Sequence, residues 1–184
     1  MIAEQILDFW FKQAGPAKWY HGGDAFDADI RNRFENFSVE AAAHLKKNGS
    51  HDWEQEPGSA LALIIALDQF TRNMYRDTKG AFAFDDIALG CARRAIDKGH
   101  DLKTDQSRRA FFYMPFMHAE DLAMQDECVR LIDMRLESES SLFHAKEHRK
   151  LITRFGRFPH RNAILGRKSS KEEAEFLHDG GYAP

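Results

Sequence analysis

The stretch ALALIIALDQFTRN at residues 60–73 decides the fold, because it is the most apolar part of the chain. Pro57 precedes it at a position typical of a first helical turn, and its first eight residues offer no polar face. These features predict a central buried helix. Asp68 and Arg72 continue the apolar column that begins at Leu61, so we expect polar side chains to face inward where this helix ends.

Composition extends the helical prediction to the whole chain. Val occurs twice and Thr four times, whereas Ala occurs 23 times, so strand formers are scarce and helix formers abundant. We predict an all-α protein of successive antiparallel helix pairs, arranged either as stacked helical hairpins or as a closed bundle. Apolar spacing and helix stop signals place further helices at about residues 27–47, 85–98, 106–114, 119–136 and 142–155, and Ser170 with Glu173 forms a capping box for a short last helix.

Length and charge limit the class of protein. The 184 residues suit one helical domain over residues 1–184, with a short frayed tail at residues 180–184. A net charge of −3 argues against nucleic acid as a partner. Acidic residues near the start and the shortness of the longest apolar run argue against export and membrane insertion. The two cysteines, Cys91 and Cys128, fit a reducing compartment, so we expect a cytoplasmic protein.

A second polar cluster surrounds His118. If a helix begins there, His118, Asp121 and Gln125 fall on one face, and an imidazole, a carboxylate and an amide could converge for acid/base chemistry. The alternative is an ordinary N-terminal turn in which acidic side chains favour the helix dipole. For the polar residues at the end of the central helix, the corresponding alternative is that Asp68 and Arg72 pair across one turn and cap the core.

A third cluster, at residues 148–167, is rich in arginine. Its guanidinium groups, with a neighbouring imidazole, are those of Arg154, Arg157, His160, Arg161 and Arg167, and Phe155 and Phe158 lie among them. Arginine in place of lysine indicates fixed, bidentate partners. Those partners are either carboxylates of the chain itself, such as those of Asp68, Glu120 and Asp121, or a bound phosphate or carboxylate.

The sequence offers little support for a metal or a cofactor. HAKEH at residues 144–148 matches the H-x-x-E-H zinc pattern, but the only carboxylates downstream belong to the short terminal helix and its end, so we expect no metal. The chain contains no glycine-rich phosphate loop, G-x-S-x-G elbow or C-x-x-C pair. We therefore expect no cofactor.

Several strings together resemble a known family. They are ILDFWF (6–11), LALIIALDQFTRNMYR (61–76), FFYMPFMHAEDLAMQ (111–125), HRKLITRFGRFPHRNAILGR (148–167) and SSKEEAEFL (169–177). The chain resembles domain-of-unknown-function family 924, uncharacterised and mainly bacterial proteins, over residues 6–177. The resemblance implies a helical fold similar to tetratricopeptide repeats, which favours stacked hairpins over a closed bundle, and it implies no particular reaction. The family motif positions present here are Asp68, Gln69, Arg72, Asn73, His118, Glu120, Asp121, Gln125, His148, Arg154, Arg157, His160, Arg161, Asn162 and Arg167.

Two hypotheses about function follow. The favoured one is a binding module whose pocket holds a small anion or a peptide carboxylate, because the chain offers no activated nucleophile and no convincing metal set. Its predicted ligand-binding residues are Arg72, Asn73, Gln125, Arg154, Arg157, His160, Arg161 and Arg167. The alternative is a hydrolase acting on a phosphorylated or carboxylated metabolite, with His118 as acid/base and Asp68 or Asp121 orienting it. Because inward-facing charges need partners, we also predict one polar cluster that brings together Asp68, Arg72, His118, Asp121, Arg157 and Arg161.

Overall fold

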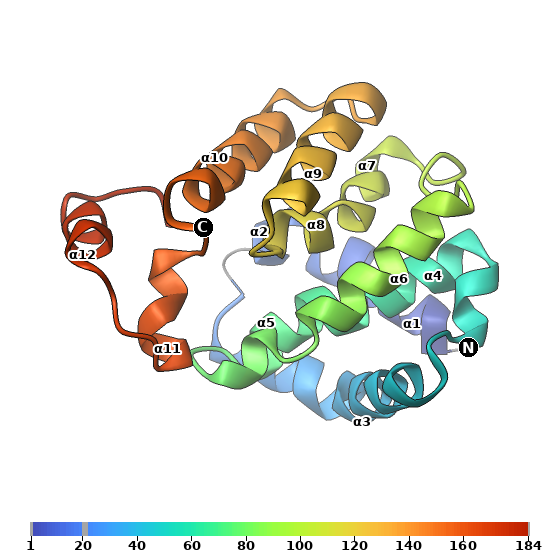
Figure 1. The fold of residues 1–184 in the computed structure, drawn as a ribbon. Helices are drawn as coiled ribbons and strands as arrows, with labels where there is room; N and C mark the ends of the chain where they lie inside the picture. The colour runs from blue at the N-terminus through green and yellow to red at the C-terminus, as the bar shows by residue number, and fades with distance from the viewer. Residues whose placement is uncertain (1, 20–21, 184) are drawn as a thin grey trace.

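The computed structural model describes residues 2–19 and 22–183, and in these ranges the chain forms helices and no strand. The predicted all-α fold is confirmed (Figure 1). The α-helices are α1 (Ile2–Asp8), α2 (Pro16–Trp19), α3 (Asp24–Asn48), α4 (Pro57–Ile64), α5 (Phe70–Met74), α6 (Asp85–Asp97), α7 (Gln106–Arg109), α8 (Met114–His118), α9 (Leu122–Arg135), α10 (Glu139–Phe155), α11 (Asn162–Leu165) and α12 (Lys171–His178). Short π or 3-10 segments are η1 (Phe9–Ala14), η2 (Asp52–Gln55), η3 (Ile65–Gln69), η4 (Lys79–Phe82), η5 (Ala110–Phe112) and η6 (Pro159–Arg161).

Several helix ends follow the local signals in the sequence. Helix α3 is capped at its C-terminus by Gly49, whose φ of 78° lies in the left-handed region that favours glycine. Helix α10 is capped in the same way by Gly156, with a φ of 70°. At α12 the predicted capping box is present, because the Ser170 side chain accepts from the backbone of Glu173 and the Glu173 side chain accepts from the backbone of Ser170.

The segment around Pro115 differs from the prediction. The helix expected at residues 106–114 is divided into α7 and η5, and Pro115 lies in the first turn of α8, where its missing N–H costs nothing. The helix expected from residue 119 begins at Leu122. Asp121 is its N-cap, and the Asp121 carboxylate accepts from the backbone N–H of Met124 at 3.0 Å.

The apolar stretch forms the centre of the molecule, as predicted. Residues 60–68 are all buried, and the line α4–η3–α5 packs against α1, α3 and α6. Aromatic rings fill the space around it; Phe70, for example, packs edge-on against Trp10 with ring centroids 5.6 Å apart. Helices α9 and α10 lie side by side as an antiparallel pair (Figure 1). Stacking of such pairs as in tetratricopeptide repeats stays a prediction.

The C-terminal segment stands apart from this core. Helices α11 and α12 project from one end of the molecule (Figure 1). Phe176 of α12 packs against a small separate cluster of Leu151, Ile152 and Phe158. Tyr182 packs on this cluster, and 2.9 Å separates its hydroxyl from Nδ1 of His144. A frayed tail at residues 180–184 stays a prediction, and Pro184 lies outside the described residues. No helix in the described ranges combines the length and apolarity that crossing a bilayer requires.

Candidate functional site

A π-helical turn carries the first residue of the site. The segment η3 widens the central helix at the point where its apolar run ends, and Asp68 within it is completely buried. Its carboxylate lies 2.8 Å from Nδ1 of His118, accepts from Nε2 of Gln69 at 2.6 Å and lies 3.3 Å from Nη1 of Arg72. Asp68 thus faces inward, as the apolar column predicts, and π turns of this kind occur frequently at functional sites.

The Asp68–His118 pair has a defined protonation state. Burial by itself raises the pKa of Asp68, but Arg72 and His118 outweigh it and hold that pKa well below its usual range. Burial and the Arg72 guanidinium lower the pKa of His118, against the opposing effect of Asp68. We therefore assign the imidazole proton to Nδ1, which donates to the ionised carboxylate. Nε2 has no hydrogen-bond partner among the described residues, and its lone pair is free at neutral pH.

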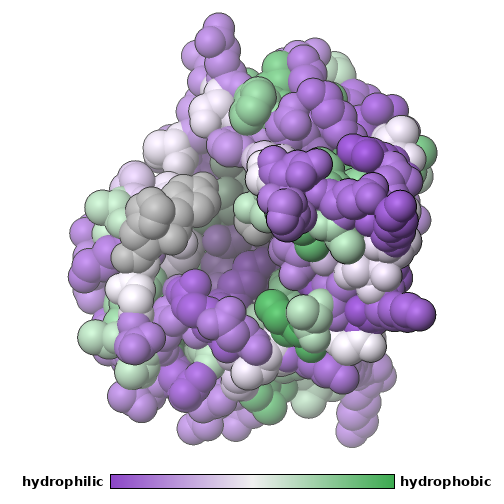
Figure 2. Space-filling model, turned by 90° about the vertical axis from the view of Figure 1, so that its left-hand side faces the viewer, coloured by the Kyte–Doolittle hydropathy of each residue, from purple (hydrophilic) through white to green (hydrophobic). Residues whose placement is uncertain are grey.

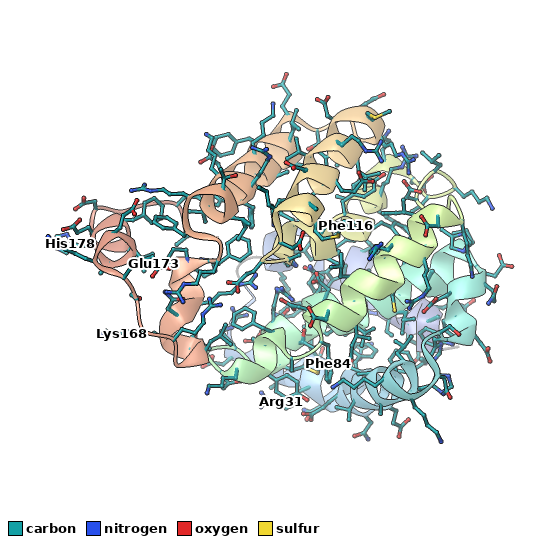
Figure 3. The ribbon with its side chains drawn as sticks, in the orientation of Figure 1. Arg31, Phe84, Phe116, Lys168, Glu173 and His178 are labelled. Atoms are coloured by element: carbon teal, nitrogen blue, oxygen red, sulfur yellow. The ribbon has the colours of Figure 1, made fainter. Side chains whose placement is uncertain are left out.

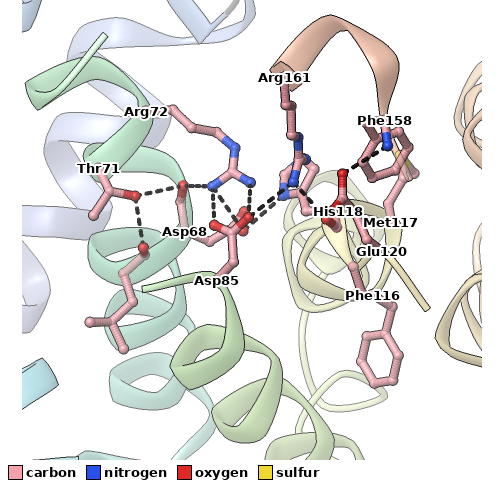
Figure 4. A network of polar contacts seen from close by, with 12 residues as sticks. Asp68, Thr71, Arg72, Asp85, Phe116, Met117, His118, Glu120, Phe158 and Arg161 are labelled. Carbon is pink, nitrogen blue, oxygen red and sulfur yellow. Dashed lines mark hydrogen bonds and ion pairs between the residues drawn. The ribbon is translucent and has the colours of Figure 1, made fainter. Parts of the chain in front are cut away.

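Asp85, at the start of α6, joins two arginines and was missed by the sequence analysis. Its carboxylate accepts from Nη1 and Nη2 of Arg72 at 3.0 and 3.1 Å and from Nη1 of Arg161 at 3.4 Å (Figure 4). Burial and the nearby Asp68 carboxylate raise the pKa of Asp85 despite Arg72. In the sequence Asp85 is indistinguishable from an ordinary acidic residue in a first helical turn.

Arg161, in η6, has a buried guanidinium nitrogen without a hydrogen-bond partner in the described structure. Its guanidinium lies between the rings of Phe82 and Phe158, 4.6 and 4.5 Å from their centroids. Nη1 donates to the backbone oxygen of His118 at 3.1 Å, whereas Nε is buried with no hydrogen-bond partner in the described structure. Burial and the neighbouring Arg72 lower the pKa of Arg161 to about 10, so it is still charged at neutral pH.

Two further arginines of the third cluster are paired within the C-terminal segment. Arg154 donates to Glu172 at 2.8 Å, and Arg157 donates to both carboxylate oxygens of Glu173 at 2.6 and 2.7 Å. Figure 3 shows Glu173 on the side of α12 that faces the rest of the chain. For Arg154 and Arg157 the structure therefore matches the alternative of internal carboxylate partners, and Arg157 is not part of the cluster around Asp68.

Glu120 ties this segment to the body of the protein. Its carboxylate accepts from Nη1 and Nη2 of Arg167 at 2.5 and 2.9 Å and from the backbone N–H of Phe158 at 2.7 Å. Arg167 therefore also has an internal partner. Because Phe158 directly precedes η6, the Glu120 contacts fix the position from which Arg161 reaches the site (Figure 4).

Other residues singled out in the sequence have local partners. Asn73 donates to the carboxylate of Asp27 at 2.8 Å. Gln125 donates to the backbone oxygens at Phe116, Met117 and Ala119. Asp121 caps α9, so the structure does not bring it to His118, and Asp68 occupies the orienting position instead.

Two more histidines surround the cluster. The His148 ring lies 6.5 Å from that of His118, and Nδ1 of His148 lies 2.8 Å from the backbone oxygen of His144. Burial lowers the pKa of His148 to about 3 and that of His160 to about 4. Both rings are therefore neutral in the folded protein at neutral pH.

Solvent reaches the centre of this arrangement. The side of the molecule that carries α11 and α12 is hollowed near its middle, with hydrophilic residues inside the hollow (Figure 2). The His118 and Asp85 side chains are each 16% exposed and that of Arg72 is 22% exposed. No group of His, Cys, Asp and Glu in the described part of the chain is arranged to hold a metal ion. What the cluster offers is an ionised carboxylate that orients a neutral imidazole, beside a guanidinium with spare donors.

Comparisons with known proteins agree with the resemblance seen in the sequence. The profile of DUF924, described as a bacterial protein of unknown function, matches residues 6–181. No curated protein matches the chain. A solved structure of a protein of unknown function from Agrobacterium tumefaciens is 43% identical, with a TM-score of 0.88, over 97% of this chain and 98% of that chain. The similarity supports the fold over its full length.

Proposed function

The chain belongs to DUF924, a family of bacterial proteins of unknown function, and from the geometry of its own site we propose that it binds a small anion, such as a carboxylate, at Arg161. One observation carries the proposal: Nε of this buried guanidinium has no partner in the described structure. Buried polar groups almost always have hydrogen-bond partners, so an orphaned donor calls for a missing ligand, ion or water.

The charges around Arg161 support an anion in particular. Arg161 shares Asp85 with Arg72, which has the shorter contacts to Asp85 and also lies 3.3 Å from the Asp68 carboxylate, so Arg161 has no carboxylate to itself within this cluster. The aromatic rings of Phe82 and Phe158 lie against the Arg161 guanidinium, and the Arg161 side chain is 7% exposed. An incoming carboxylate would give Arg161 a partner of its own, in surroundings of low dielectric where charge-assisted hydrogen bonds are strong.

Thermal unfolding in the presence of added anions tests this proposal. Sodium acetate, sulfate and phosphate are compared with sodium chloride at equal ionic strength, in the wild type, in Arg161→Met and in the matched control Arg154→Met. We expect at least one of these anions to raise the Tm of the wild type and of Arg154→Met, but not that of Arg161→Met. An unchanged Tm with all three anions, or an equal rise in Arg161→Met, contradicts the proposal.

Hydrolysis is the second candidate function, and the Asp68–His118 hydrogen bond of 2.8 Å favours it. A neutral imidazole held by an ionised carboxylate is the arrangement that general-base catalysis uses. Of the two orienting carboxylates considered from the sequence, Asp68 is the one in contact with His118. A cytoplasmic location remains part of the proposal and fits two free, buried cysteines, Cys91 and Cys128.

A further inference from the structure

We infer that the same site hydrolyses a carboxylic ester, with His118 as the general base that activates a water molecule and Arg161 as the group that stabilises the oxyanion. The inference rests on the proposed function, because the carboxylate released by hydrolysis is the kind of anion that Arg161 is proposed to bind. It adds a substrate class and a reaction to that binding site.

The geometry around His118 suits a base. Asp68 fixes the imidazole through Nδ1 at 2.8 Å, which leaves Nε2 as the reactive atom. The charged and titratable neighbours are Asp68 and Arg72 on the central helix, Asp85 on α6, His148 on α10, and His160 and Arg161 in η6. Burial and Arg72 keep His118 neutral at pH 7, so it accepts a proton without first having to lose one.

Arg161 is suited to the developing negative charge. Its Nη1 donates to the backbone oxygen of His118, and the same three side chains, those of Asp68, Arg72 and Asp85, act on the charge of both the guanidinium and the imidazole. It is charged at neutral pH and is held between Phe82 and Phe158. A fixed positive charge in a water-excluded setting stabilises an oxyanion more strongly than the same charge in solvent.

The reaction balances with water as the only co-reactant. The oxygen of water attacks the ester carbonyl carbon as its proton passes to Nε2 of His118, and the carbonyl oxygen becomes an oxyanion paired with Arg161. When the tetrahedral intermediate collapses, the bond from carbon to the alcohol oxygen breaks. That oxygen takes the proton from Nε2, which regenerates the neutral imidazole. The products are an alcohol and a carboxylic acid, which ionises to the carboxylate.

Water is the nucleophile because the structure shows no activated side chain in its place. No Ser, Thr or Cys within the described ranges forms a hydrogen bond with His118. The hydroxyl of Thr71, close to Asp68 in the chain, donates to the backbone oxygen of Leu67 at 2.8 Å. Burial raises the pKa of Cys91 and of Cys128 to about 12, so neither forms a thiolate at neutral pH. We therefore expect no acyl-enzyme.

Hydrolysis of p-nitrophenyl acetate, followed by release of p-nitrophenolate, tests the inference. We expect His118→Gln to lower the wild-type rate above background by about 10²- to 10⁴-fold, and Arg161→Met to lower it by about 10²- to 10³-fold. The control His178→Gln, which replaces an exposed histidine of α12, keeps the wild-type rate. Equal rates in the wild type and His118→Gln, or a burst of p-nitrophenolate equal to the protein concentration, overturn the inference.

The pH dependence separates a positioning role of Asp68 from a structural one. The wild-type rate is expected to rise with pH and level off, with a midpoint below 6.5, the ordinary pKa of histidine. In Asp68→Asn the midpoint moves to lower pH, because the Asp68 charge raises the pKa of His118. A midpoint that is the same in both proteins contradicts this role for the Asp68–His118 pair.

Acetate binding distinguishes failure of the inference from failure of the proposed function. We expect acetate to raise the Tm of His118→Gln as it raises that of the wild type, although the variant has lost hydrolysis. A Tm rise without hydrolysis that depends on His118 overturns the ester reaction and leaves the anion site. Hydrolysis that depends on His118 but not on Arg161 overturns the oxyanion role and leaves only the base. If acetate does not raise the Tm and hydrolysis does not depend on His118, the ester reaction fails, and a carboxylate as the anion of the proposed site fails with it.

Discussion

Replacing Arg161 by methionine should stabilise the protein in the absence of ligand. The side chain is 7% exposed, and its guanidinium shares Asp85 with Arg72. The nearby carboxylates therefore compensate only in part for the burial of the Arg161 charge and for the neighbouring Arg72 charge. Methionine keeps a flexible apolar chain between Phe82 and Phe158, and thioether sulfur packs favourably against aromatic rings.

The size of the effect follows from the pKa and the contacts. The pKa of Arg161 falls from 12.5 to about 10 on folding, so the folded state disfavours the charged guanidinium. At 1.36 kcal/mol for each pKa unit, this lowers the free energy of unfolding by about 3 kcal/mol. Two cation–π contacts and the two hydrogen bonds, to the His118 backbone oxygen and to Asp85, are lost with the guanidinium and are worth roughly 2 kcal/mol together. The expected gain in the free energy of unfolding is about 1 kcal/mol, which corresponds to a Tm about 2–4 °C higher.

Urea unfolding of the wild type and Arg161→Met at pH 7, followed by far-UV circular dichroism, measures the difference. Arg167→Met is the control, because it removes the bidentate partner of Glu120. We expect that variant to lose about 1–3 kcal/mol. If Arg161→Met is destabilised as strongly as Arg167→Met, then Arg161 is an ordinary structural ion-pair residue and the reasoning behind the anion site is wrong.

Three further predictions concern stability and reactivity. In the folded protein the pKa values of His148 and His160 are about 3 and 4, so at a pH below the unfolded pKa of about 6.5 both histidines take up protons on unfolding. Between pH 7 and pH 5 the free energy of unfolding, measured in urea, should therefore fall by about 2 kcal/mol for each histidine. The fall should be smaller in His148→Gln, and an equal fall in that variant would contradict this prediction. Cys91 and Cys128 are buried with pKa values near 12, so a disulfide reagent such as DTNB should label them only on unfolding, and rapid labelling of the native protein would contradict their burial. Ser170→Ala removes the cap of α12 and should cost about 1 kcal/mol, seen as faster hydrogen exchange in α12, while unchanged exchange would show that tertiary contacts alone hold this helix.

Local sequence signals were sufficient to predict the helices and the inward-facing position of Asp68 in the site. The scarcity of strand formers can be read from composition alone, and it predicts the all-α fold correctly. The apolar column leading to Asp68 depends only on residues within a few helical turns, and it predicts the burial of Asp68 correctly. The capping box at Ser170 is local in the same sense.

The surroundings of Arg161 in the site depend on tertiary contacts, which local sequence signals do not contain. Asp85 and Phe82 meet Arg161 across 76 and 79 residues of chain, and no spacing rule connects them. Asp121 shows the opposite problem. Its place beside His118 in the sequence suggested a shared helical face, but the chain turns between α8 and α9 and uses the Asp121 carboxylate as a cap.

The π turn at Ile65–Gln69 explains why the site lies where it does. A π turn adds a residue to the helical circuit and so changes the face that later residues present. The apolar run that enters the turn does not fix this rotation, because it has no polar side to keep in solvent. The rotation of the helix is instead fixed by the contact of Asp68 with His118 and by the contact of Arg72 with Asp85. A buried carboxylate without such partners would cost several kcal/mol. Replacing Asp68 therefore changes the central helix as well as the imidazole. His118 and Arg161 reach the site from outside that helix, so their variants leave the residues of the central helix unchanged.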